Sequence, residues 1–336
     1  MVISECEPDL TKELKEMTKW TKTGLCLGLG VGTLMGACSE APVGDRVDQN
    51  TVRDEASPSP ESSKTIVFGV YTTDTAKDAV AKFRPLLNSL ENDLSTHFGY
   101  PVSVVTNVYG DYDDGLDALV NGEVDFTRLG PASFVLAQKR EPGVSLIAME
   151  TYKKSKTFHG IICVHSDSDI ESVEDISGRS FAFGDENSTI GRYLSQQLLM
   201  QHGIHSADLT SFEYLGKHDK VGYMVGAGQF DAGALKESTF KKLQEKGEPL
   251  RELARFPNVT KPWVARSGLD EELIEAIQKS LLAQEDPAVL AAVGKSGFVV
   301  ATDDDYAPIK ESIDSNVGFV RSKTAVVVEE PSTTEG

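Results

Sequence analysis

The feature that most constrains the fold is an alternation of strand-like and helix-like segments that occurs twice along the chain. Thr65 to Tyr71 is rich in β-branched and aromatic residues, and residues 76–98 carry apolar side chains at helical spacing. The alternation continues to residue 151, restarts at Gly160 and runs on to residue 266, where helical segments follow. Strands that alternate with helices at this interval predict βαβ units and mostly parallel sheets. The sequence therefore predicts an α/β protein.

The two series predict two lobes, each a mostly parallel sheet flanked by helices. We assign residues 65–156 and 262–321 to lobe 1 and residues 157–261 to lobe 2, with the crossing segments as a hinge. A chain of 336 residues is long enough for two such cores. Ligands of open parallel sheets lie beyond the carboxyl ends of the strands, so the cleft between the lobes is the expected site.

The N-terminal region is typical of a secretion signal. Residues 17–37 contain Lys19 and Lys22, then a 14-residue uncharged stretch that ends in small residues before Cys38. This end resembles the bacterial lipoprotein cleavage box, which implies cleavage before Cys38 and acylation of its thiol; the alternative is an ordinary secretory signal. Residues 1–16 lie upstream of the signal, so they are an extra or untranslated segment if Met17 is the start.

Two further segments are expected to lack a fold of their own. Residues 38–64 are rich in Ser, Pro, Asp and Glu and have no apolar periodicity, which predicts a flexible tether. Residues 322–336 are expected to be a loose tail.

Composition excludes several classes of protein. Lys and Arg number 33 against 52 Asp and Glu, a net charge of −19, which argues against nucleic-acid binding because that needs a basic face.

Of four cysteines, only Cys163 lies in a predicted core strand, so we expect a buried thiol and no disulfide. The six histidines show no metal-ligand spacing, and no nucleophile elbow or phosphate loop is present. We therefore expect no metal, no cofactor and no catalysis.

The most informative segment is the turn between a predicted strand, residues 179–183, and a predicted helix that begins at about Thr189. Backbone amides at a helix start point outward and attract anions, and Ser188 and Thr189 add hydroxyl donors. Gly191 lets an anion approach the backbone. This pattern favours an anion cradle. The alternative is that Ser188 is only an N-cap of an ordinary helix.

The same turn resembles the phosphonate-, phosphite- and phosphate-binding proteins of bacterial ABC importers, through Asn-Ser-Thr-x-Gly at 187–191 after Ala-Phe-Gly-Asp at 182–185. Shorter pieces of the resemblance follow in the same order over about residues 65–321. They are 68–70 (FGV), 85–87 (PLL), Tyr112, 122–125 (GEVD), 130–132 (GPA), 176–179 (ISGR), 217–219 (KHD), 228–233 (GQFDAG), 262–266 (PWVAR) and 305–306 (DY). The resemblance implies a two-lobed periplasmic-binding-protein fold, type II-like.

The resemblance also implies a set of ligand contacts. Hydroxyls and amides of residues 188–191 would hold the phosphoryl oxygens, Tyr112 would donate its phenol and His218 its imidazole N–H. Asp231 would orient neighbours or accept a proton from the ligand. The candidate set comprises Tyr71, Tyr112, Phe158, His159, Ser188, Thr189, Ile190, Gly191, His218 and Asp231. Taken without the resemblance, a lone Tyr112 or His218 is more often an ordinary surface or core residue than a ligand contact.

Departures from the family pattern bear on the ligand. Ile190 stands where the family often has Ser, and Phe158 where it has a ligand-facing Tyr, so His159 is a candidate replacement donor. Lys261 occupies the position of an acid that, in the family, binds the ammonium group of aminophosphonates. A second such acid of the family aligns near Ser238. We therefore expect phosphate, phosphite or a small alkylphosphonate rather than an aminoalkylphosphonate.

The resemblance implies a monomeric solute-binding protein of an ABC importer, held outside the cytoplasmic membrane by a lipid anchor on Cys38. Its partners would be the oxyanion, the permease and the ATPase. Two alternatives stay open: a ligand-sensing partner of a membrane signalling protein, and a secreted enzyme that acts on phosphate esters.

Overall fold

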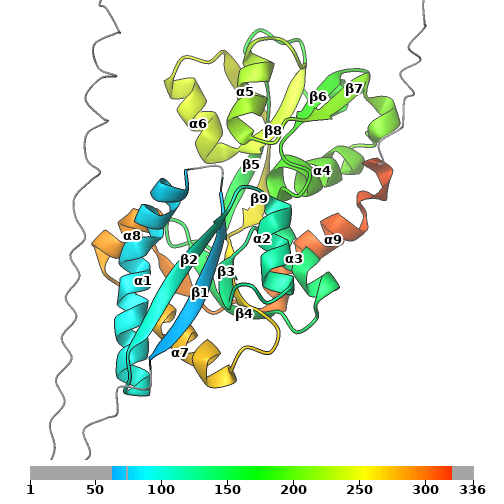
Figure 1. Cartoon of the computed structure of the whole chain (residues 1–336). Coiled ribbons are helices and arrows are strands. Elements are labelled where there is room, and N and C mark those ends of the chain that lie inside the picture. Colours follow the sequence, from blue (N-terminus) through cyan, green and yellow to red (C-terminus); the bar gives the residue numbers. More distant parts are fainter. Residues whose placement is uncertain (1–62, 73–74, 320–336) are drawn as a thin grey trace, which may run out of the picture. The chain divides into compact units, whose positions relative to one another are not determined.

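The computed structural model describes residues 63–72 and 75–319, which form two β-sheets flanked by helices (Figure 1). The first sheet has six strands in the order β11-β4-β10-β3-β1-β2 and the second has five in the order β7-β6-β8-β5-β9. The strands of the first sheet are β1 (Lys64–Tyr71), β2 (Val102–Tyr109), β3 (Phe126–Arg128), β4 (Ser145–Thr151), β10 (Pro262–Ala265) and β11 (Gly297–Val299). Those of the second are β5 (Thr157–His165), β6 (Ser180–Phe183), β7 (Ser211–Tyr214), β8 (Ala232–Lys236) and β9 (Leu250–Val259). Cys38, the predicted signal, the predicted tail and the predicted tether up to residue 62 lie outside the described part of the chain. The last residue assigned to the tether, Lys64, instead begins β1, where it pairs with Val102 of β2.

Helices cover both faces of the first sheet. The helices of this lobe are α1 (Ala76–Phe98), α2 (Tyr112–Val120), α3 (Pro131–Arg140), α7 (Glu271–Leu282) and α8 (Pro287–Val293). α1 begins at its N-cap Thr75 and turns one apolar stripe toward the sheet, where Phe83 and Leu87 are buried. The Trp263 ring stacks on Phe68 at a centroid separation of 5.0 Å and forms the centre of this core. Burial of these large apolar rings stabilises the lobe.

The second sheet is covered in the same way. α5 (His218–Gly226) and α6 (Glu237–Glu245) pack on one face, and a π-helical turn η2 (Thr189–Leu194) continues into α4 (Ser195–Gln201) on the other. Short 3-10 segments complete the lobe at η1 (Glu174–Ile176) and η3 (Ser206–Asp208). Cys163 is fully buried in β5, which confirms the expectation of a core thiol.

The chain crosses from the first sheet to the second between β4 and β5, and returns between β9 and β10. β5 and β9 pair antiparallel from Thr157 opposite Val259 to His165 opposite Leu250, so the outgoing and returning strands lie side by side. At the end of the described chain, η4 (Asp303–Tyr306), α9 (Ala307–Asp314) and η5 (Asn316–Phe319) follow one another. α9 contacts both α3 and η2 and so spans the two lobes.

Three details differ from expectation. Both sheets are mixed, because the crossing strands β5, β9 and β10 enter antiparallel to their neighbours. The helix expected from Thr189 to Gly203 starts as a π-turn, since the Ser188 carbonyl accepts hydrogen bonds from the amides of both Arg192 and Tyr193. The three-residue strand β11 was not expected, because so short a segment carries no periodicity.

Among the described residues, no helix combines the length and apolar character needed to cross a membrane.

Candidate functional site

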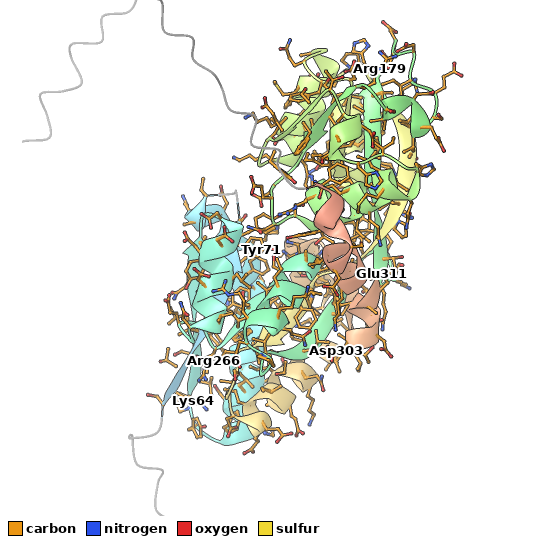
Figure 2. The ribbon with its side chains drawn as sticks, turned by 90° about the vertical axis from the view of Figure 1, so that its right-hand side faces the viewer. Lys64, Tyr71, Arg179, Arg266, Asp303 and Glu311 are labelled. Atoms are coloured by element: carbon orange, nitrogen blue, oxygen red, sulfur yellow. The ribbon has the colours of Figure 1, made fainter. Side chains whose placement is uncertain are left out.

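Two cavities adjoin the ends of the strands where the lobes meet, and Tyr71 lies in this junction (Figure 2). The first, of about 280 Å³, is lined by Arg128 and Lys295 from lobe 1, by Lys261 from the crossing between β9 and β10, and by Lys236 and α6 from lobe 2. The second, of about 520 Å³, is lined by Tyr112, Asp185, Ser188, His218 and neighbouring residues. Lys242 lines both, so the cavities are neighbours in one interlobe region.

The turn that was predicted to form an anion cradle begins with a side-chain cap. Ser188 caps η2, and its Oγ accepts a hydrogen bond from the Gly191 amide at 3.0 Å. The amides of Thr189 and Ile190 precede the first main-chain hydrogen bond of the turn, which the Arg192 amide donates to Ser188 at 3.0 Å. Ser188 is therefore an N-cap, and two amides rather than three, those of Thr189 and Ile190, lie outside the hydrogen bonds of the turn itself.

Gly191 has a different role from the one expected. A Cβ at this position would lie 2.7 Å from the Gly184 Cα, and the Gly184 amide donates to the Gly191 carbonyl at 2.8 Å. The missing side chain allows η2 to pack on the end of β6, so it serves backbone packing instead of anion approach. The Ile190 side chain is also buried, which leaves only its amide for the site.

Thr189 connects the two lobes. Its Oγ1 accepts a hydrogen bond from the Ala132 amide at 2.9 Å, at the start of α3. No side chain of α3 itself caps that helix, so lobe 2 supplies the acceptor. The neighbouring Gly130 amide donates to the Tyr71 hydroxyl at 2.6 Å. Two helix starts, η2 and α3, therefore face one another across the junction and together offer a concentration of amide donors.

Two tyrosines connect these helix starts. The rings of Tyr71 and Tyr112 lie 4.5 Å apart, and Tyr112 and Ser188 line the same cavity. Burial, reinforced for Tyr112 by the nearby Tyr71 and Asp185, raises the pKa of both phenols. They stay protonated, and each can donate a hydrogen bond to an oxyanion.

His218 begins α5 and lines the second cavity. Its Nδ1 is buried and has no hydrogen-bond partner among the described residues. Burial, followed by repulsion from Lys236 and Lys261, lowers the pKa of His218 to about 4. The ring is therefore neutral at neutral pH, and its Nδ1 is available for a hydrogen bond to a ligand.

A buried ion cluster lies at the back of the first cavity. The Glu150 carboxylate is fully buried, forms a salt bridge with Arg128 and lies 2.6 Å from Lys295 Nζ. Burial alone would raise the pKa of Glu150, but Arg128 and Lys295 outweigh it and hold the pKa at about 2. No pattern in the sequence predicted this cluster, because its three members are far apart in the chain. They come from β4, β3 and the segment before β11.

Two other predicted site residues, Phe158 and His159, lie outside the Ser188 turn, on β5. Phe158 lines the first cavity, where its ring lies 5.1 Å from Lys236 Nζ. His159 lies beside β9 and approaches Glu237 at 3.6 Å, so it does not replace a ligand donor there.

Asp231 corrects the expectation of a ligand contact. It precedes β8 at its amino end, where its carboxylate accepts hydrogen bonds from the Ser180 amide and hydroxyl at 2.8 and 2.6 Å. The nearby Arg179 lies at the end of lobe 2 remote from Tyr71 (Figure 2). The site lies at the carboxyl ends of the strands, so a residue at the amino end of β8 cannot reach it.

Within the described ranges, no three His, Cys, Asp or Glu side chains are grouped so that they could hold a metal ion.

Known proteins resemble this chain in sequence and in fold. "Probable ABC transporter phosphite binding protein PhnD1" of Prochlorococcus marinus is 28% identical over 172 residues, 47% of this chain and 57% of that protein. The match thus spans less than two thirds of that relative. "Phosphonates-binding periplasmic protein" of Escherichia coli is 23% identical over 265 residues, 75% of this chain and 76% of that protein.

The solved structure of Prochlorococcus marinus PhnD1 in complex with methylphosphonate shares the fold. It superposes with a TM-score of 0.60 at 22% identity and covers 76% of this chain and 97% of that one. The family model for the phosphonate ABC transporter periplasmic substrate-binding protein matches residues 68–306. The chain therefore belongs to the family of periplasmic substrate-binding proteins of phosphonate ABC transporters.

Proposed function

We propose that this protein captures a phosphorus oxyanion between its lobes and delivers it to the permease of an ABC importer. The observation that carries the proposal is the convergence of neutral donors from both lobes: the Thr189 and Ile190 amides, the Tyr112 hydroxyl and the His218 ring. Hydrogen bonds to a charged acceptor contribute about 1.5–3 kcal/mol each, so a few of them support micromolar affinity after ordering costs. The net charge of −19 does not oppose this, because salt screens distant charges beyond about 8 Å.

The proposed ligands are phosphate, phosphite or a small alkylphosphonate. Lys261 stands at the edge of the site, 5.3 Å from the Tyr71 ring centroid, and a lysine disfavours a ligand that carries an ammonium group. We therefore expect 2-aminoethylphosphonate to bind more weakly than methylphosphonate.

Calorimetric titration with phosphate, phosphite, methylphosphonate, 2-aminoethylphosphonate and sulfate tests both statements. Ser188→Ala removes the η2 cap and the hydroxyl beside Tyr112, and we expect about tenfold weaker binding or worse. Asp270→Ala is the matched control, because Asp270 caps α7 through the Leu273 amide and lies on another helix. If 2-aminoethylphosphonate binds best of all, or if the Ser188 variant binds as tightly as the unchanged protein, the proposal is wrong.

We further propose that the protein works at the outer face of a membrane, anchored by a lipid on Cys38. The support is the signal-like segment that ends at Cys38 in the sequence. Expression of the full chain with a labelled fatty acid should label it, and Cys38→Ser should abolish the label and release the protein from the membrane fraction. Equal labelling of both forms would disprove the anchor.

A further inference from the structure

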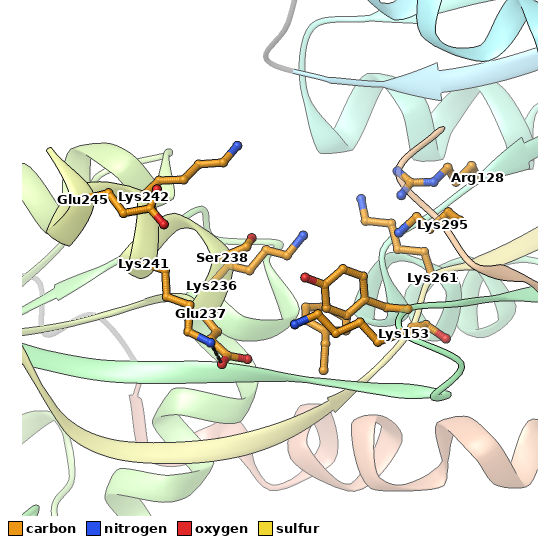
Figure 3. A pocket seen from close by; sticks show the side chains of 13 residues that line it. Arg128, Lys153, Lys236, Glu237, Ser238, Lys241, Lys242, Glu245, Lys261 and Lys295 are labelled. Atoms are coloured by element: carbon orange, nitrogen blue, oxygen red, sulfur yellow. Dashed lines mark hydrogen bonds and ion pairs between the residues drawn. The ribbon is translucent and has the colours of Figure 1, made fainter. Parts of the chain in front are cut away.

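The first cavity holds far more basic than acidic side chains. Two acidic residues line it, Glu237 and Glu245. The seven basic residues that line it are Arg128, Lys153, Lys236, Lys241, Lys242, Lys261 and Lys295. The basic side chains come from both lobes and converge on one space, with Lys236 and Lys242 on one side and Arg128, Lys261 and Lys295 on the other (Figure 3). In a chain whose net charge is −19, so local an excess of positive charge marks a place for an anion.

The acidic groups around the cavity do not balance this charge. Glu150 is already shared by Arg128 and Lys295, and Glu237 pairs with Lys241 at 2.6 Å and with Arg255 at 2.8 Å. Glu245, at the end of α6, is exposed to solvent. Among the described residues, the acids near the cavity therefore form no ion pair with the ammonium groups of Lys236 and Lys261.

Lys236 and Lys261 have aromatic neighbours but no salt bridge among the described residues. Lys236 Nζ lies 5.1 Å from the Phe158 ring centroid, and Lys261 Nζ lies 5.3 Å from that of Tyr71. Burial, with repulsion from Arg128 and Lys295, lowers the pKa of Lys236 to about 8 and that of Lys261 well below its usual value. Two desolvated and unpaired lysines cost stability, which a bound anion would restore.

This positive cavity is continuous with the oxyanion cradle. Tyr71 contacts Lys261 through its ring and Tyr112 through a ring pair, Tyr112 lines the second cavity together with Ser188, and Lys242 lines both cavities. A ligand held at Ser188 would therefore have the lysines within reach of a short tail. About 280 Å³ accommodates one further acidic group together with some waters, since a water takes up about 30 Å³.

We propose that Lys236 and Lys261 bind a second acidic group of the ligand, so that the protein selects phosphonates that carry a carboxylate at their far end. The proposal rests on the function proposed above and names the class of ligand within it. The cradle would hold the phosphonate through neutral donors, and the lysines would hold the carboxylate through charge. Methylphosphonate and phosphate would then occupy only part of the site.

Three ligands that differ only at the far end test the proposal: 3-phosphonopropionate, propylphosphonate and 2-aminoethylphosphonate. We expect 3-phosphonopropionate to bind the full chain about tenfold more tightly than propylphosphonate, and 2-aminoethylphosphonate to bind most weakly, in calorimetric titrations at pH 7. Lys236→Met and Lys261→Met should remove most of the advantage of the carboxylate and change propylphosphonate binding less than about twofold. Lys279→Met, at an exposed position of α7, is the matched control and should change neither.

The outcomes separate the two proposals. If propylphosphonate binds as tightly as 3-phosphonopropionate, the lysines do not bind a tail and this inference is wrong, while the proposed function stands. If none of the three ligands binds and phosphate, phosphite and methylphosphonate fail as well, the proposed function is wrong and this inference falls with it. The comparison of ligands on the unchanged protein decides the question even if a lysine variant fails to fold.

Discussion

His218 is kept neutral by its surroundings. Two lysines, Lys236 and Lys261, and burial oppose its protonation, so the ring enters the site as a neutral donor or acceptor at any pH above about 5. Neutral donors suit a binding protein, because they hold an oxyanion without adding a charge that must be desolvated when the ligand binds.

The lowered pKa of His218 predicts how the stability of the folded protein depends on pH. The pKa of His218 is about 4 in the folded protein against an ordinary 6.5, so the unfolded chain binds more protons below pH 6.5. Its contribution is complete above pH 6.5 and is lost as the pH falls toward 4, by about 3 kcal/mol. His218→Asn should abolish that part of the loss, which urea unfolding of both proteins at pH 7, 5.5 and 4.5 measures. If the difference in stability between the two proteins stays constant across this range, the ring is not held neutral.

At the scale of the element, the site depends on how closely η2 packs against the end of β6. The contact needs glycine on both sides, at Gly184 and Gly191. It sets the direction in which the first amides of η2 point, and therefore the geometry of the cradle.

Gly191→Ala should separate η2 from β6, because the added methyl would lie 2.7 Å from the Gly184 Cα. We expect a loss of about 1–3 kcal/mol in stability from overpacking, together with weaker oxyanion binding. Thermal unfolding and calorimetry of the variant measure both. Gly110→Ala is the control, since nothing lies within 4 Å of a Cβ there. Equal behaviour of the two variants would contradict the packing role.

The elements themselves could be predicted well where a periodic pattern was long. α1 has the bounds that its apolar spacing indicated, and the Ser188 turn lies between a strand and a helix start as expected. The presence of antiparallel pairs in both sheets could not be predicted, because the residues of a strand do not determine whether its neighbours run parallel or antiparallel to it.

The site was predicted less completely than the fold. Ser188, Thr189, Tyr112 and His218 were predicted from local pattern and resemblance, and the structure brings Tyr112, Ser188 and His218 to one cavity. Ala132, whose amide meets Thr189, gave no signal of its own, since any residue has an amide. The buried Glu150 cluster joins residues far apart in sequence, and only the folded chain brings them together.

At the scale of the whole molecule, two crossing segments and, among the described residues, two direct hydrogen bonds connect the lobes near the site. One of these bonds joins Asn187 Nδ2 to Asp113 Oδ1 at 3.0 Å. The crossings join β4 to β5 and β9 to β10, and the Ala132–Thr189 bond joins α3 to η2. Paired strands at the crossings leave rotation of one lobe against the other as the easiest large motion.

Thr189→Val should remove the acceptor for the Ala132 amide while it keeps the shape of the side chain. We expect the lobes to separate more readily in the ligand-free protein, seen as a larger radius of gyration in small-angle scattering, and stability to fall by about 1–3 kcal/mol. Thr189→Ser keeps the acceptor and should scatter like the unchanged protein. Identical curves for the valine and serine variants would show that this bond does not hold the lobes.

The hydrogen bond between Ala132 and Thr189 also affects the energetics of loading. A ligand oxygen that accepts from the Ala132 amide must first displace the threonine hydroxyl, so this step exchanges one partner for another. Such a swap releases little heat, and the net driving force has to come from expelled water and from groups that had no partner before. His218 Nδ1 is such a group, so the selectivity of the protein resides more in its unsatisfied atoms than in those already paired.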